Sequence, residues 1–97
     1  SMQETQRLLT EGKTLQEIAE QRKIKPSTIH DHLLELAIQG QLQASVYLEK
    51  EAILQNLAQT EQDPRLWVYR DWRAQEATLS YLDFRLYQIQ QIWQEKE

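Results

Sequence analysis

Basic and hydroxyl side chains gather in a short stretch of the chain, between residues 13 and 30. They are Lys13, Thr14, Lys23, Lys25, Ser27, Thr28 and His30. Ammonium and hydroxyl groups are donors that proteins use to hold phosphate oxygens, and such side chains also reach base edges in DNA. Asp31 follows directly and would repel a phosphate. The stretch therefore predicts a weak, mainly phosphate-directed contact with DNA that involves these eight residues.

No combination of residues in the sequence is typical of a catalytic site. The sequence has no glycine-rich phosphate loop, no Gly-x-Ser-x-Gly turn and no cysteine. His30 and His32 are two positions apart, so on a helix they point about 200° apart and cannot share one metal ion. His32 borders an apolar stripe and is expected to be packed and hydrogen-bonded. The sequence predicts no catalytic residue, no metal, no cofactor and no enzyme activity in this chain.

Three helices in the first 40 residues would position the basic stretch. A first helix over 3–11 ends at Gly12, because glycine tolerates the left-handed conformation of a helix end. Thr14 and Glu17 match a capping box that opens a second helix. Pro26 has the backbone angle of a first helical residue, and the third helix it opens ends at the second glycine. The tight connection between the last two helices predicts a helix-turn-helix unit.

The third helix has two different faces. Three aliphatic residues form its core stripe: Ile29, Leu33 and Leu36. Ser27, His30 and Asp31 lie on the opposite side, in the first turns, where a ligand could reach them. Leu34 and Ile38 also lie on that side, farther along. Since large aliphatic residues avoid water, the second half of the chain is expected to cover both.

The second half predicts further helices. Residues 41–46 alternate polar and apolar side chains and could form a stub of β-wing or an extended linker. A helix is expected over 48–60, with three inward candidates: Ala52, Ile53 and Leu57. Asp63 and Pro64 read as the start of another helix, over 64–75.

The last helix has the clearest pattern in the chain. Ser80 to Asp83 reads as a helix start. Four large apolar residues then form one stripe: Leu82, Leu86, Ile89 and Trp93. The stripe predicts a helix that packs one face against large apolar partners.

Arginine and aromatic residues alternate in residues 65–73, which read RLWVYRDWR. This composition suits stacking on unpaired bases together with phosphate contact. It equally describes a helical core with arginine stems along its edge, and the core interpretation is favoured. Trp67 and Arg70, expected on one face, are kept as a possible secondary contact with nucleic acid.

Two motifs give the chain a family resemblance, and the first of them has two parts. Residues 12–19 read GKTLQEIA and residues 24–33 read IKPSTIHDHL, and residues 77–86 read ATLSYLDFRL. In this order they resemble the helicase-associated helix-turn-helix domain found at the C-terminus of some bacterial RecQ-family helicases and of related Gram-positive proteins. The resemblance implies an accessory DNA-binding domain of a larger DNA-processing protein. The first motif is also similar to the helix of LuxR-type regulators.

Length and composition agree with an all-α fold. The chain has 97 residues, two glycines and two prolines, which favours helices over tight turns. One domain over 2–97 is expected, with about six helices, a winged-helix-like helix-turn-helix core over 2–44 and a helical extension over 45–97. The longest apolar run has four residues, which excludes a membrane span. The lack of cysteine favours a cytoplasmic protein.

The net charge of −4 limits binding to a polyanion, so any DNA contact should be modest. Expected partners are DNA, duplex or partly single-stranded, and the helicase domains of a parent protein or another protein, but no membrane. Two alternatives stay open: a protein–protein interaction module of a regulatory or DNA-repair assembly, and the DNA-binding domain of a transcription regulator.

Overall fold

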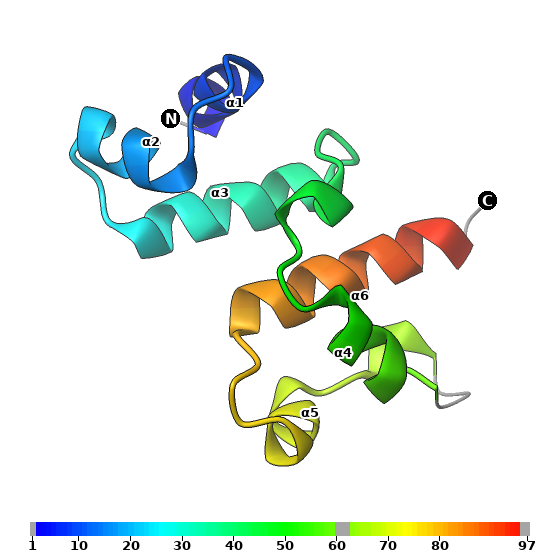
Figure 1. Ribbon diagram of the computed structural model, residues 1–97. Helices are drawn as coiled ribbons and strands as arrows, with labels where there is room; N and C mark the ends of the chain where they lie inside the picture. The colour runs from blue at the N-terminus through cyan, green and yellow to red at the C-terminus, as the bar shows by residue number, and fades with distance from the viewer. Residues whose placement is uncertain (1, 60–62, 96–97) are drawn as a thin grey trace.

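The computed structural model describes residues 2–59 and 63–95, and these form six α-helices and two 3₁₀-helices with no strand among them (Figure 1). In chain order the elements are α1 (Met2–Thr10), α2 (Leu15–Arg22), α3 (Pro26–Ile38), η1 (Ala44–Tyr47), α4 (Glu51–Leu57), η2 (Pro64–Leu66), α5 (Tyr69–Gln75) and α6 (Tyr81–Glu95). The all-α prediction is confirmed. None of the described helices has the length and apolar character needed to cross a membrane.

The first three helices begin and end where their capping residues predict. Gly12 follows α1 with a positive φ of 88°. The Thr14 hydroxyl accepts a hydrogen bond from the Glu17 N–H, and the Glu17 carboxylate accepts one from the Thr14 N–H, so both halves of the capping box form. Leu8, Ile18 and Ile29 pack together as the core of this helix-turn-helix unit.

Helices α3 and α6 lie side by side and join the two halves of the molecule (Figure 1). Ala37 on α3 packs with Leu86 and Ile89 on α6, and Leu34 packs against the same cluster. The second half therefore covers Leu34, as expected. It leaves Ile38 46% exposed, so the prediction that this residue is covered is wrong.

One expectation for residues 41–60 is wrong, and another is confirmed only in part. Neither a wing nor an extended linker forms, because residues 44–47 turn into η1 and bury Ala44 against α6. The next helix, α4, is shorter than expected and buries Leu54, whereas Ala52 is exposed. Residue 60, the expected end of that helix, lies outside the described residues.

The helix expected over 64–75 is interrupted. Asp63 caps η2 as its type predicts, by accepting from the Arg65 N–H. The buried Gln88 amide on α6 then donates to the carbonyls of Pro64 (2.7 Å) and Trp67 (3.3 Å). The Pro64 carbonyl also accepts from the Trp67 N–H at 3.2 Å, which closes the single turn of η2, and α5 begins only at Tyr69.

Helix α6 begins as predicted, with the Ser80 hydroxyl accepting from the Asp83 N–H. The Asp83 carboxylate turns away to accept from the Glu49 and Lys50 N–H groups at the start of α4. Leu86 and Ile89 are buried, whereas Trp93 is 42% exposed and contacts the end of α3 through its indole N–H, which donates to the Ala37 carbonyl.

Candidate nucleic-acid interface

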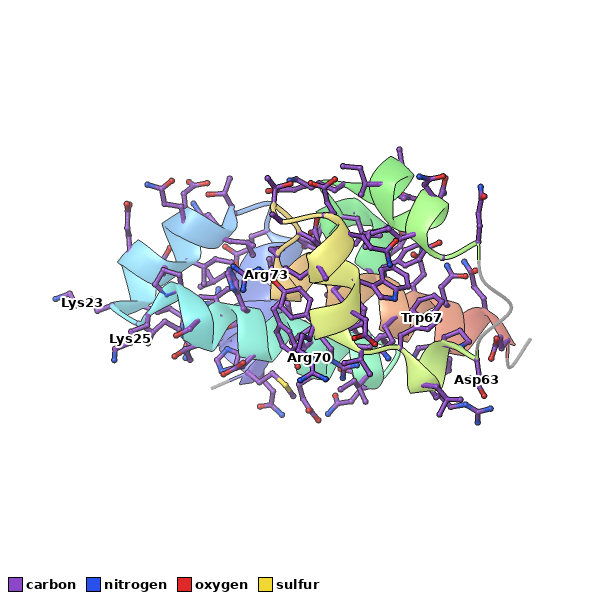
Figure 2. The ribbon with its side chains drawn as sticks, turned by 90° about the horizontal axis from the view of Figure 1, so that it is seen from below. Lys23, Lys25, Asp63, Trp67, Arg70 and Arg73 are labelled. Atoms are coloured by element: carbon purple, nitrogen blue, oxygen red, sulfur yellow. The ribbon has the colours of Figure 1, made fainter. Side chains whose placement is uncertain are left out.

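The connection between α2 and α3 presents two lysines. Lys23 has a φ of 54°, a left-handed conformation, and its N–H bonds to the carbonyls at the end of α2. Lys25 is the N-cap residue of α3. Figure 2 shows both side chains at one end of the molecule, pointing outward. Within the described residues, neither ammonium group has an ion pair or a hydrogen bond, so both charges are available to a phosphate.

The first turns of α3 carry the other expected contact residues. Ser27 and Asp31 are exposed, and Thr28 and His30 are half-buried. No acidic residue occupies the first helical turn, so the positive end of the helix dipole is not neutralised there. The structure thus brings the α3 residues and the two turn lysines together at one corner of the molecule.

The start of α2 has fewer backbone N–H groups available to a phosphate than the sequence implies. The Thr14 N–H and the Glu17 N–H bond within the capping box, so they cannot also hold a phosphate. These hydrogen bonds from Thr14 hold the pKa of Glu17 below its usual value, which keeps a negative charge beside them. Lys13 is exposed and remains the only cation expected to contact phosphate at this helix start.

A groove of about 450 Å³ runs along the first turns of α3. Ser27, His30 and Asp31 line one side, and Ser80 and Tyr81 at the start of α6 line the other. We call this the α3–α6 groove. Sequence reasoning did not identify it, because it arises where two helices 50 residues apart in the chain approach each other.

The secondary contact pair separates in the structure. Trp67 is only 8% exposed, with its ring 4.6 Å from Trp72 and stacked 5.9 Å from Tyr87. The favoured core interpretation therefore applies to Trp67, and the ring offers no open face for a base. Arg70 is exposed at the start of α5, and Arg73, which sequence reasoning did not single out, is exposed one turn later (Figure 2).

His32 is packed and hydrogen-bonded, as predicted. Its Nδ1 lies 2.8 Å from the hydroxyl of the fully buried Thr5. Burial, with the charge of Arg22 nearby, lowers the pKa of His32 below its ordinary value. The residue therefore supports the packing of α1 on α3 and is not positioned to bind DNA.

A sequence model described as a helix-turn-helix domain matches residues 1–88 of the chain. The chain belongs to this helix-turn-helix domain family. The match runs through η1, α4, α5 and the first half of α6, so the family's domain includes elements beyond the three N-terminal helices. No curated protein and no solved structure gives a significant match.

Proposed function

We propose that this chain is an accessory DNA-binding domain of a larger, helicase-type DNA-processing protein. Membership of the helix-turn-helix family suggests DNA binding. The resemblance of residues 12–33 and 77–86 to helicase-associated domains supports the parent protein. In this proposal residues 2–44 make the principal contact, and residues 45–97 support them.

The observation that carries the proposal is that Lys23 and Lys25, both exposed at the start of α3, have no ion pair with any residue that the structure describes. Helix-turn-helix proteins place the start of the second helix of the motif in the major groove. Here Lys23 and Lys25 would meet phosphates, and Ser27, Thr28 and His30 would face base edges. Lys13 and Thr14 would approach the backbone from the start of α2.

The acidic residues limit the affinity of the domain for DNA. Asp31 lies among the contact residues, and the chain has a net charge of −4. We expect two to four phosphate contacts and a dissociation constant of about 10⁻⁶ M or weaker at physiological salt. Such a domain would add to the affinity of a larger protein through its tethered, high local concentration.

Fluorescence anisotropy with labelled duplex and single-stranded oligonucleotides tests the proposal, over about 20 to 200 mM salt. The expected result is weak duplex binding whose affinity falls with salt by a slope of roughly two to four. Absence of binding at the lowest salt would refute it. A salt-resistant preference for one duplex sequence would instead favour a transcription regulator.

One observation favours a second candidate, a protein-interaction module. The α3–α6 groove is lined by apolar residues such as Leu15, Leu34 and Tyr47, and by the carboxylates of Asp31 and Glu49. These features fit a partner segment with an apolar residue and a basic one. Specific capture of a protein partner by a domain that ignores DNA would favour this function.

A further inference from the structure

Arg70 and Arg73 form a second basic site on α5. They are three positions apart on one helix and so share a face. Both are exposed, and in the described part of the chain neither guanidinium has an ion pair or a hydrogen bond. Figure 2 shows them on α5, on a side of the molecule from which Lys23 and Lys25 are also visible.

Helix α5 has only seven residues and is attached to the rest of the molecule by a hydrogen bond and by aromatic packing. The Tyr69 hydroxyl donates to the Leu79 carbonyl at 2.6 Å. The Tyr69 ring packs 5.5 Å from Phe84, and Trp72 packs 5.2 Å from the same ring. An arginine pair on a fixed helix loses less conformational entropy on binding than one on a loop would.

The tyrosine contacts place this helix next to the α3–α6 groove. The Tyr69 ring meets the Tyr81 ring edge-on, with 5.4 Å between centroids, and Tyr81 lines the groove opposite the first turns of α3. Figure 1 shows α3 and α5 on either side of the segment that leads into α6. The groove is therefore flanked by α3 on one side and by α5 beyond Tyr81 on the other.

Negative charges lie in the α3–α6 groove, and positive charges lie on the helices that flank it. The groove itself carries carboxylates, Asp31 and Glu49, which repel phosphates. Three cations that have no ion pair among the described residues lie outside it: Lys25 at the start of α3, and Arg70 and Arg73 on α5. A duplex lying across this face would keep its phosphates on the two basic edges and off the acidic groove.

We propose that Arg70 and Arg73 hold the phosphate backbone of the same duplex that the start of α3 contacts. This inference rests on the proposed function, because it takes duplex DNA as the ligand at α3. Arginine suits the role, since its planar guanidinium donates two parallel hydrogen bonds to phosphate oxygens. The two contacts would fix how the domain is oriented on DNA without reading its sequence.

The test compares three variants with the unaltered chain, using a labelled 16-base-pair duplex in anisotropy titrations at several salt concentrations. The longest axis of the molecule is 41 Å, which corresponds to about 12 base pairs at 3.4 Å each, so this duplex spans both edges. The first variant is Arg70→Gln with Arg73→Gln. The second is Lys25→Gln, which tests the contact at α3.

The third variant is the matched control, Arg7→Gln with Arg65→Gln, which removes the same two charges. Its arginines are exposed and already paired, Arg7 with Glu4 and Glu11, and Arg65 with Asp63 at 2.7 Å. All the altered side chains are on the surface, and thermal melts establish that each variant stays folded. The expected result is a salt slope lower by about one to two for the α5 pair and by about one for Lys25→Gln, with little change in the control.

The outcomes separate the two claims. Equal slopes for the α5 pair and the control, with a reduced slope for Lys25→Gln, would overturn only the role of α5. A reduced slope for the α5 pair with no effect of Lys25→Gln would overturn the shared duplex and the contact at α3. No binding by the unaltered chain at about 20 mM salt would overturn both.

Discussion

The Thr5 hydroxyl links three helices through its hydrogen bonds to two side chains. Arg22 on α2 donates to the Thr5 oxygen, since a guanidinium can only donate. The hydroxyl proton is then available to Nδ1 of His32 on α3, which can accept it when the ring is neutral. A second proton on His32 would remove that acceptor and place a charge beside Arg22. The neutral form is thus the one that fits the fold.

Stability should therefore depend on the charge state of His32. Its pKa is lowered in the folded state, so the unfolded chain takes up the proton first as pH falls through about 6.5. The contribution is complete above that pH, and we expect the free energy of unfolding to decrease between about pH 7 and pH 5.5. His32→Gln should remove this dependence. Urea denaturation at several pH values measures it.

His30 is the matched control, because it lies half-buried in the groove two positions away. His30→Gln should keep the pH dependence of the unaltered chain. If His32→Gln keeps it as well and His30→Gln loses it, the assignment to the Thr5 contact is wrong.

Helix ends and their connections fix the arrangement of the elements. Gly40 ends α3 with a φ of 73°, and a Cβ at this position would lie 3.0 Å from the Trp93 ring. The Trp93 indole also donates to the Ala37 carbonyl at 3.1 Å. Glycine at residue 40 is thus needed for the backbone conformation and for the approach of α6.

Substitution of Gly12 and of Gly40 separates the effect of backbone conformation from that of the Trp93 contact. Gly12→Ala should cost about 1 kcal/mol, since φ is 88° but nothing lies within 4 Å of the new methyl group. Gly40→Ala should cost more, about 2 kcal/mol or above, because the ring of Trp93 must also move. Urea melts measure the difference, and the indole N–H signal of Trp93 in an NMR spectrum should shift only in Gly40→Ala. Equal losses would show that the Trp93 contact contributes nothing.

The same elements show what the sequence can predict. Gly12, Thr14, Pro26 and Ser80 act on residues a few positions away, and each marks a real helix end. The break before α5 is bonded to Gln88, which lies 21 to 24 residues from its two carbonyl partners, so no local pattern predicts this contact.

The candidate site divides in the same way. The exposed lysines at the start of α3 could be predicted from periodicity and capping. The buried position of Trp67 and the α3–α6 groove depend on tertiary packing between the two halves. The arginine pair on α5 could have been predicted from the sequence, since Arg70 and Arg73 have helical spacing. Only the structure shows which face of α5 is exposed.

The whole molecule depends on the packing of the two halves across α6. Leu86 is fully buried against α3, and Trp67 is buried in the aromatic cluster at the far side of α6. Leu86→Ala should cost about 2–5 kcal/mol, and Trp67→Ala about 3–5 kcal/mol. Val46→Ala is the control, since Val46 is 67% exposed and should lose under about 0.5 kcal/mol.

Urea denaturation provides these values. If Trp67→Ala lowers the free energy of unfolding as little as Val46→Ala does, Trp67 is not a core residue and is again a candidate for stacking on a base. A loss comparable to that of Leu86→Ala would confirm its place in the core.

The proposed function requires that the first turns of α3 face DNA. Asp31→Asn removes a carboxylate from that surface and keeps its size, whereas Lys25→Glu reverses a charge beside it. Both side chains are exposed, so neither change should unfold the chain. Partial unfolding would weaken binding in both variants, and opposite signs therefore identify a true contact.

The duplex affinities of these two variants, measured by anisotropy at low salt, test whether the first turns of α3 contact DNA. We predict that Asp31→Asn binds more tightly by about 0.5–1 kcal/mol. We predict that Lys25→Glu binds more weakly, with a salt slope lower by about one or more. Unchanged affinity in both folded variants would show that the first turns of α3 do not contact DNA and would favour the protein-interaction function.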